Sequence, residues 1–442
     1  MFKIFRASEA LLSILQRNAA LDPQVPDAVQ AGIRRVFGQD LSPESAVAEL
    51  LADVRERGDD ALREWSARID GVQLKTLVID KKQIETAVSR IPPELVYALE
   101  LAADRIRQFH SCQPIPEWTT SAMGGILGQR FTPIQKVGVY VPGGTAPLPS
   151  SLLMSVIPAQ VAGVPEITVA TPPGDAAAGV PDIILATAAI SGIETIFTIG
   201  GALAVAALAF GTETVSKVDK IIGPGNLFTT LAKRQVYGTV GIDGLYGPTE
   251  TAVVADEFAN PAWVAADLLA QAEHDVLATA ILFTPSLKLA EAVQIDLGRQ
   301  IESLSRAEII EVSLAHSGGI VLTEDLDQAC QMASDFAAEH TCLAVDNIEE
   351  CLGKLHNAGG LFIGERSFEV LGDYVAGPSH VMPTGGTARF ASPLNVLDFM
   401  KISSIIQLDD ATSARLSPIA AQIANAEQLT AHANAALLRM ES

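Results

Sequence analysis

A pattern that repeats through the middle of the chain limits the folds open to it. From residue 136 onward, short runs rich in β-branched residues each end in a glycine-containing turn. Each turn leads into a stretch with the apolar spacing of a helix. The four runs cover residues 136–141, 166–170, 195–199 and 218–222. Strand, glycine turn and helix in regular alternation are typical of a parallel, doubly wound sheet.

A second set of similar runs follows, at 251–255, 278–283, 319–322, 341–345 and 360–363. The chain has 442 residues, which is more than one hydrophobic core normally supports. Helical spacing dominates residues 1–130, most clearly in 47–65 and 93–110, and a helical pattern without a strand signal covers 412–440. We therefore expect an α/β protein with two Rossmann-like parallel-sheet domains, a helical N-terminal region and a C-terminal helical arm.

Net charge, hydropathy and cysteine content limit which partners and which cellular compartment we expect for this protein. A formal net charge of −22 and a pI near 4.7 disfavour nucleic acid and anionic membranes. Residues 1–15 carry charged side chains within an apolar stretch, so we predict an amphipathic helix rather than a signal peptide. The longest apolar run, 202–210, is too short to span a bilayer. Four cysteines without a CxxC pair favour free thiols in a reducing cytoplasm.

Gln271 and His274 stand three residues apart in an apolar stretch with helical spacing. On a helix they would share one face, and an amide oxygen beside an imidazole is a plausible half of a metal site. The alternative is a histidine whose polar atoms are satisfied within the core. The pair alone does not separate these two interpretations.

Three further places could carry chemistry. Glu339 and His340 lie where a helical stretch meets a strand, and could act as a general acid/base pair or simply end the helix. Asp373 precedes a loop at 377–380 that contains an imidazole, and could serve a site or cap the local turn. The glycine turns could approach a nucleotide, but no GxGxxG motif follows the first strand, so ordinary tight turns remain equally open.

Six separated motifs, in order, resemble the histidinol dehydrogenase family, and the likeness runs from about residue 30 to 440. They are Lys136–Pro147, Val218–Asn226, Gln271–His274, Ala338–His340, Gly372–Tyr374 with Ser379–Thr384, and Leu429–His432.

The resemblance implies a set of site residues. One zinc ion per subunit would be bound by Gln271, His274, Asp373 and His432, and NAD would be contacted by Tyr140 and Asn226. Glu339 and His340 would be the catalytic pair. The residues expected to contact the substrate are Thr249, Gln271, His274, His340, Asp373, Glu427 and His432.

The resemblance also implies a reaction and an assembly. The reaction is the four-electron oxidation of L-histidinol to L-histidine through L-histidinal with two NAD⁺, the last steps of histidine biosynthesis. His340 would take the hydroxyl proton, and Glu339 would activate the water that hydrates the aldehyde. The family forms an intertwined homodimer in which terminal segments complete the neighbour's site. Such a protein is expected in the cytoplasm, without nucleic acid or membrane partners.

The expected domains follow the same resemblance. An N-terminal helical arm covers 1–27, and a discontinuous zinc and substrate domain covers 28–136 with 249–393. The NAD-binding domain covers 137–248, and a C-terminal helical dimerisation arm covers 394–442.

Two positions depart from the family pattern. Thr249 replaces a serine and keeps its hydroxyl, so we expect its hydrogen bond to survive. Leu203 replaces a glutamine, and losing one neutral hydrogen bond costs about 0.5–1.5 kcal/mol, which predicts a weaker cofactor site. Two rival functions stay open. One is the same chemistry on another alcohol such as a sulfonated diol, against which Glu427 argues. The other is a catalytically silent homologue that binds a metal or ligand.

Overall fold

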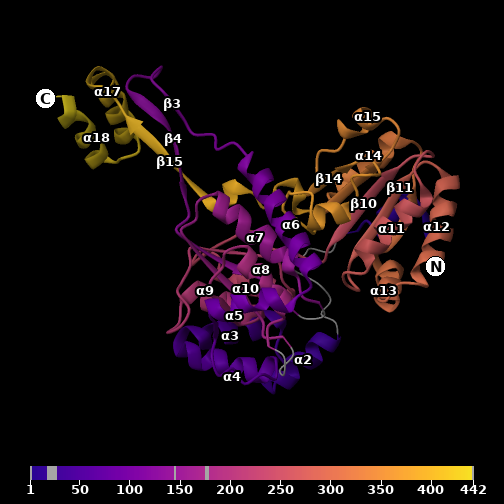
Figure 1. Ribbon diagram of the computed structural model, residues 1–442. Helices are drawn as coiled ribbons and strands as arrows, with labels where there is room; N and C mark the ends of the chain where they lie inside the picture. The colour runs from indigo at the N-terminus through magenta and orange to yellow at the C-terminus, as the bar shows by residue number, and fades with distance from the viewer. Residues whose placement is uncertain (1, 17–26, 144–145, 175–178, 441–442) are drawn as a thin grey trace. The chain divides into compact units, whose positions relative to one another are not determined.

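The computed structural model describes residues 2–16, 27–143, 146–174 and 179–440, drawn in Figure 1. The expected N-terminal arm and the first family motif extend in part beyond these residues. The chain forms two compact units. Unit 1 contains Met1–Cys112 and Gln135–Asp398, and unit 2 contains Gln113–Ile134 and Phe399–Ser442. Each unit is described by itself.

The first sheet of unit 1 has the strand order β2-β7-β6-β5-β8-β9. Its strands are β2 (Val78–Ile79), β5 (Lys136–Tyr140), β6 (Glu166–Thr171), β7 (Ile196–Thr198), β8 (Lys220–Ile222) and β9 (Gly241–Ile242). Only β2 runs antiparallel to its neighbour. This confirms the parallel sheet predicted from the first four runs.

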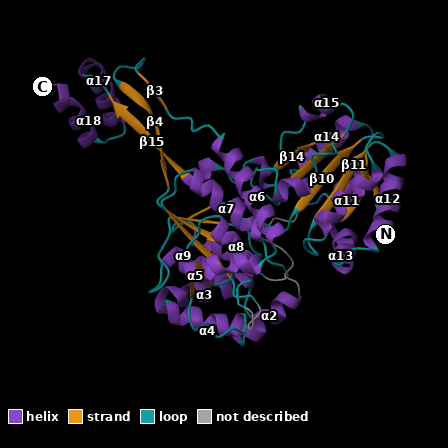
Figure 2. Cartoon of the chain, in the orientation of Figure 1, coloured by secondary structure: helices purple, strands orange, loops and turns teal. Residues whose placement is uncertain are grey.

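Helices cover both faces of this sheet, as Figure 2 shows. On one side are α9 (Gly201–Phe210) and α10 (Leu227–Val236), and on the other α7 (Pro149–Val161) and α8 (Asp182–Ile190). A second layer of N-terminal helices packs outside them. These are α3 (Pro43–Arg57) and α4 (Asp59–Ile69) against α9, and α5 (Lys81–Ala87) and α6 (Pro93–Ser111) against α8 and α7.

The second sheet is parallel throughout, with the order β1-β12-β11-β10-β13-β14. Its strands are β1 (Ile4–Arg6), β10 (Glu250–Ala255), β11 (Thr279–Thr284), β12 (Gly318–Leu322), β13 (His340–Ala344) and β14 (Gly360–Ile363). One face packs on α11 (Pro261–Ala272), α12 (Leu287–Ile301) and α13 (Ala307–Ser317). The other face packs on α14 (Leu326–Phe336) and α15 (Ile348–Leu352). The predicted second α/β unit is thus confirmed.

The predicted amphipathic helix at the N-terminus is wrong over its first residues. Ile4 pairs with Ile320 as part of β1, and the helix α1 covers only Ala7–Leu11. The edge of the sheet offers unpaired backbone groups on β12, and Phe2 is buried in the core beside it. Pairing with a distant strand therefore overrides the local helical spacing.

The N-terminal helices differ from expectation at one point. The stretch 47–65 is divided into α3 and α4 at Gly58, whose φ of +55° a side chain would disfavour. Both helices share a hydrophobic core with α9 of the first sheet. The start of α3 is as predicted, because the Ser42 hydroxyl accepts the backbone N–H of Ser45.

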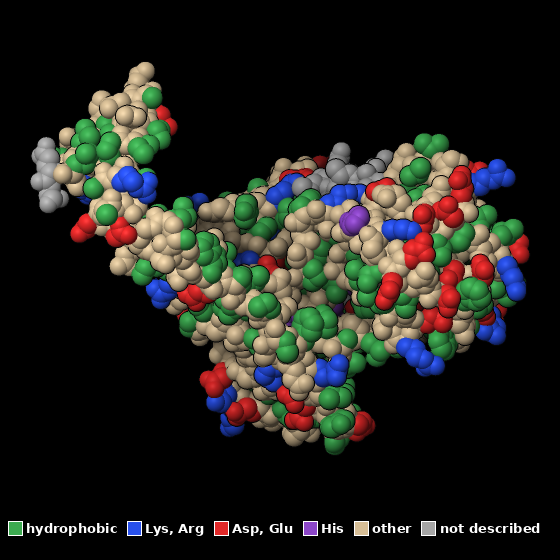
Figure 3. Space-filling view, turned by 90° about the horizontal axis from the view of Figure 1, so that it is seen from above, with side chains coloured by type: hydrophobic (Ala, Val, Ile, Leu, Met, Phe, Trp, Pro, Cys, Tyr) green, Lys and Arg blue, Asp and Glu red, His purple; other side chains and the backbone are tan. Residues whose placement is uncertain are grey.

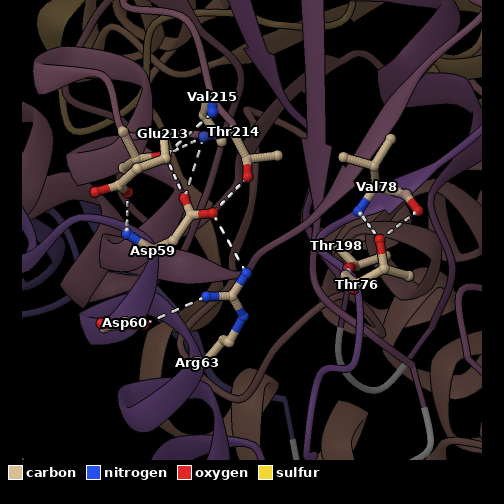
Figure 4. A network of polar contacts seen from close by, with 10 residues as sticks. Asp59, Asp60, Arg63, Thr76, Val78, Thr198, Glu213, Thr214 and Val215 are labelled. Carbon is tan, nitrogen blue, oxygen red and sulfur yellow. Dashed lines mark hydrogen bonds and ion pairs between the residues drawn. The ribbon is translucent and has the colours of Figure 1, made fainter.

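Asp59 joins α4 to the loop that follows α9 (Figure 4). Its carboxylate accepts the Thr212 hydroxyl at 2.6 Å and the backbone N–H of Thr214 at 3.3 Å. It also accepts the Thr214 hydroxyl and lies 3.4 Å from Arg63. In return, Glu213 accepts the backbone N–H of Asp59 at 2.8 Å. One buried carboxylate thus fixes the outer helical layer to the first sheet.

Unit 2 is built on a three-stranded antiparallel sheet. Its strands are β3 (Trp118–Thr120), β4 (Ile126–Pro133) and β15 (Met400–Gln407), followed by helices α17 (Asp410–Ala426) and α18 (Thr430–Leu437). The prediction of helices alone in 1–130 and 394–442 is therefore wrong at these strands. β3 pairs with the neighbouring β4, but β4 and β15 find each other across most of the chain, so local periodicity carries little signal for β15. No helix within the described ranges is long and apolar enough to cross a membrane.

Candidate active site

Gln271 lies fully buried in the last turn of α11. Its side-chain nitrogen donates to the Thr249 hydroxyl at 2.6 Å, and its amide oxygen has no hydrogen-bond partner among the described residues. His274 is exposed and lies beyond the end of the helix at Ala272, so the prediction that both residues share a helical face is wrong. Both still lie in the same short segment before β11.

Thr249 links Gln271 to Glu339. Its hydroxyl donates to the Glu339 carboxylate at 2.5 Å, and the backbone N–H of Glu250 donates to the same oxygen at 3.3 Å. Burial raises the pKa of Glu339 well above its usual range, and the Thr249 hydroxyl opposes that rise. Glu339 is thus a buried carboxyl held by two donors.

His340 opens β13 directly after Glu339, and its ring is buried. Nδ1 lies 3.6 Å from Glu369 and 4.0 Å from Glu339, whereas Nε2 lies 3.7 Å from Asp373. Neither ring nitrogen makes a hydrogen bond within the part of the chain described. Burial lowers the pKa of His340 to about 3, and the neighbouring His274 and His380 lower it further. The imidazole is therefore neutral near pH 7.

Asp373 approaches this imidazole from the short helix α16 (Glu369–Tyr374). Burial raises the pKa of its carboxyl to about 7. Its backbone carbonyl accepts Nδ1–H of His380 at 2.9 Å, which leaves Nε2 of His380 to accept the Ser151 hydroxyl at 3.3 Å. This chain of contacts joins the second sheet's site to the start of α7.

The site gathers at the amino ends of β10 and β13 in the second sheet. Thr249 immediately precedes β10, and His340 is paired with Thr251 at the first position of β13. Sequence reasoning missed three of the residues found here. His380 stood in a loop already noted for its imidazole, and Glu369 was a carboxylate in an apolar stretch. Nothing in the sequence pointed to Ser151.

Glu427 and His432 belong to unit 2. Glu427 ends α17, His432 lies in α18, and both side chains are exposed. The other expected site residues described above belong to unit 1.

The donor set of unit 1 suits a zinc ion. The unpaired amide oxygen of Gln271, the imidazole of His274 and the carboxylate of Asp373 are the nitrogen and oxygen donors that zinc accepts. Among the residues that the structure describes, no group of three or more His, Cys, Asp and Glu side chains is already arranged to hold a metal. Three of the four expected ligands therefore belong to unit 1, without a preassembled cluster.

The two expected cofactor contacts both line one cavity of about 360 Å³ in unit 1. It lies where β5, β7 and β8 end, which is the usual ligand-binding edge of a parallel sheet. Tyr140 accepts the backbone N–H of Gly201 at 3.0 Å, and Asn226 caps α10 by accepting the N–H of Thr229 at 3.1 Å. Leu203 lines the same cavity. The start of α9 faces it through Gly200 and Gly201, where backbone N–H groups favour an anion.

Comparison with known proteins identifies the chain. The family profile described as histidinol dehydrogenase matches residues 35–440. The histidinol dehydrogenase of Deinococcus radiodurans is 49% identical over 94% of this chain and 95% of that relative. That of Neisseria meningitidis serogroup A is 45% identical over 95% of this chain and 99% of the relative. A crystal structure of histidinol dehydrogenase from Elizabethkingia anophelis, at 33% identity, covers all of this chain and 98% of its own, with a TM-score of 0.90.

These matches place the chain among NAD-dependent oxidoreductases. It belongs to the histidinol dehydrogenase family.

Proposed function

We propose that the protein oxidises L-histidinol to L-histidine through L-histidinal, with two NAD⁺ per turnover and a zinc ion at the site. The observation that carries this proposal is the buried group at the amino ends of β10 and β13. Thr249 holds Glu339, and a neutral His340 stands beside Asp373. A base that is neutral near pH 7, next to a hydrogen-bonded carboxylate, suits two successive oxidations that each release a proton.

His340 is the proposed base for the alcohol proton. Its low pKa keeps the imidazole unprotonated in the resting site, and neither ring nitrogen is used by another described group. Glu339 is the proposed activator of water for hydration of the aldehyde. Burial raises the pKa of Glu339, so the carboxyl holds a proton strongly once it has taken one from water, while the Thr249 hydroxyl and the Glu250 N–H oppose that rise and favour the ionised form that acts as the base.

The zinc ion would be held by Gln271, His274, Asp373 and His432. When bound, such an ion supplies a Lewis acid that orients the amino alcohol and polarises its oxygen. The unpaired oxygen of Gln271 supports this assignment, because a buried amide oxygen without a partner is otherwise costly. Glu427 and Thr249 are proposed as further substrate contacts.

NAD⁺ is proposed to bind in the cavity lined by Tyr140 and Asn226. Both side chains have polar partners already, which fixes their orientation. The N-terminus of α9 supplies backbone donors for the negatively charged cofactor. The Leu203 side chain adds only apolar surface to this cavity, so one polar contact expected from the family is absent.

The proposed assembly is a homodimer in which unit 2 of one copy packs against the other copy. Unit 2 exposes a set of large apolar side chains, and Figure 3 shows hydrophobic groups gathered on it. They include Ile402, Ile406, Ile419, Ile423, Leu437 and Leu438. A surface of this kind favours burial against a partner, and Glu427 and His432 on the same unit give the partner copy a role in the site. Sedimentation velocity tests this, and a monomer at micromolar concentration would contradict it.

One assay tests the reaction. Purified, zinc-loaded protein should form two NADH for each histidinol consumed, with histidine as the product. One NADH per alcohol, or turnover of a sulfonated diol in preference to histidinol, would assign the machinery to a different small polar alcohol. Absence of turnover on either substrate would favour a silent homologue. A cytoplasmic location is proposed with this biosynthetic role.

A further inference from the structure

Glu369 is a buried carboxyl that none of the proposed steps uses. It is 1% exposed, and neither of its carboxyl oxygens makes a hydrogen bond to a residue that the structure describes. Burying such a group without a partner is costly, so a specific interaction in the working site would explain its presence. The imidazole of His340 faces this carboxyl, with Nδ1 3.6 Å from Oε1 of Glu369.

The helix α16 brings two carboxyls to the two nitrogens of one ring. Glu369 is its first residue and Asp373 its fifth, and residues four apart lie on the same helical face. Glu369 approaches Nδ1 of His340, whereas Asp373 approaches Nε2 at 3.7 Å. The His340 ring is therefore held between them, and one element of the fold sets both distances.

The other carboxyl near Nδ1 is already engaged. Glu339 lies farther away, at 4.0 Å, and its nearer oxygen accepts the Thr249 hydroxyl and the Glu250 N–H. Neither carboxyl oxygen of Glu369 makes a hydrogen bond to a described residue, although the Thr251 hydroxyl lies near it. A carboxyl also keeps an acceptor oxygen whether or not it is protonated. Glu369 is thus the better placed acceptor for a proton on Nδ1.

We infer that Glu369 is a positioning residue that accepts Nδ1–H of His340 and so keeps the lone pair of Nε2 free on the side of Asp373. This inference rests on the proposed role of His340 as the base. A neutral imidazole has one proton and one acceptor, and the hydrogen bond at one nitrogen decides which nitrogen accepts. With Nδ1 protonated, the substrate's proton is taken by Nε2. The imidazolium that results keeps its Nδ1–H directed at the Glu369 carboxyl.

The experiment compares E369Q and E369M in the zinc-loaded, full-length enzyme. Gln keeps the shape of Glu but can turn an N–H donor toward Nδ1, and Met fills the volume without any acceptor. We expect both to lower kcat for histidinol and for histidinal about 100- to 10,000-fold, the range seen when a triad histidine loses its orienting carboxylate. The KM for histidinol and the zinc content should stay within about threefold.

Two controls keep the outcomes distinct. E365Q changes a neighbouring carboxylate that accepts the backbone N–H of Asn260, outside the site, and should leave kcat unchanged. H340N tests the proposed function itself. If that variant keeps its activity, His340 is not the base, independently of the result for Glu369. If H340N is inactive while a folded E369Q or E369M keeps the wild-type kcat, the positioning role is overturned. Loss of activity that follows loss of zinc, of the thermal transition or of histidinol affinity overturns it equally.

Discussion

The hydroxyl of Thr249 donates to the carboxylate of Glu339 across 2.5 Å. The Thr249 hydroxyl oxygen also accepts an N–H of the Gln271 side-chain amide at 2.6 Å. One hydroxyl therefore joins Glu339, the proposed water-activating group, to Gln271, a proposed zinc ligand. The extra methyl of threonine, relative to the serine of the family pattern, leaves this line of hydrogen bonds intact.

Replacing Thr249 by valine should break that line. Val keeps the shape but removes the hydroxyl, so the Gln271 amide loses its partner and Glu339 keeps only the Glu250 N–H; leaving a buried polar group unpaired costs about 1–3 kcal/mol. We expect histidinal oxidation to slow about 10- to 100-fold in steady-state assays. Thr249→Ser is the matched control and should stay within about threefold of wild type. Equal rates for the Val and Ser variants would show that the hydroxyl is dispensable.

Glu339→Gln should slow histidinal oxidation far more than histidinol oxidation, because only the second step needs an activated water. Rapid-mixing assays with each substrate measure the two steps separately. An equal loss in both steps would count against the division of roles.

His340→Asn should impair both oxidations, because each needs a base. Since burial lowers the pKa of His340 to about 3, the wild-type acid limb should lie below pH 6.5, and activity should fall as the pH drops through it. The pH profile of the residual activity of the variant should lack this acid limb. A pH–rate profile with an unchanged acid limb would assign it to another group.

Chelation should abolish activity, and added zinc should restore it. His274→Asn and His432→Asn should each lower the zinc content, because each removes one of four proposed ligands. Atomic absorption on the purified variants measures this, with His316→Asn as the control, since His316 is exposed and hydrogen-bonded only to Ser317 among the described residues. Full zinc occupancy in both test variants would exclude the ligand assignment.

Leu203→Gln should tighten NAD⁺ binding, by about tenfold at most if one hydrogen bond near 1 kcal/mol is regained. Leu203 lines the cavity of Tyr140 and Asn226, so a polar end at this position can reach a ligand there. Histidinol affinity should barely change, and calorimetric titration with each ligand measures both. Unchanged or weaker NAD⁺ binding would mean that the cavity wall is packed around leucine and that the cofactor lies differently.

Asp59→Asn should lower the free energy of unfolding at pH 7 by about 1.5–3 kcal/mol, the usual value of a hydrogen bond to a charged group. Burial opposes ionisation, but the Thr212 and Thr214 donors outweigh it and hold the pKa of Asp59 below 3.8. The native-state pKa is therefore below the unfolded one. The contribution is present above pH 3.8 and is lost as the pH falls through the native value.

Urea unfolding at pH 7 and pH 3 checks this, and the difference between wild type and variant should shrink at the lower pH. Asp60→Asn changes the adjacent, 84% exposed carboxylate and should have little effect. Equal destabilisation in the two variants would contradict the role of the buried network.

The sequence predicted the two parallel sheets well because their strands are short β-branched runs that end in glycine turns. The boundaries of β5 and β14 differ from prediction by one residue at most. Local sequence patterns could not predict β1 or β15, since each becomes a strand only by pairing with residues hundreds of positions away. His274 was expected on a helix, but α11 ends two residues earlier. Glu369, Ser151 and His380 are joined to the site by tertiary folding, which residue spacing does not record.

The pairing of β4 with β15 also governs the order in which the chain can fold. Residue 126 pairs with residue 407, so the central sheet of unit 2 cannot form until nearly all of the chain has left the ribosome. Strand pairing across so long a loop is slow, because the entropy of closing the loop is lost before the contacts form. Until then β4 remains an unpaired edge, open to pairing with other chains. A nascent chain of this protein that stalls before residue 400 is therefore expected to aggregate through β4, although both sheets of unit 1 are already complete.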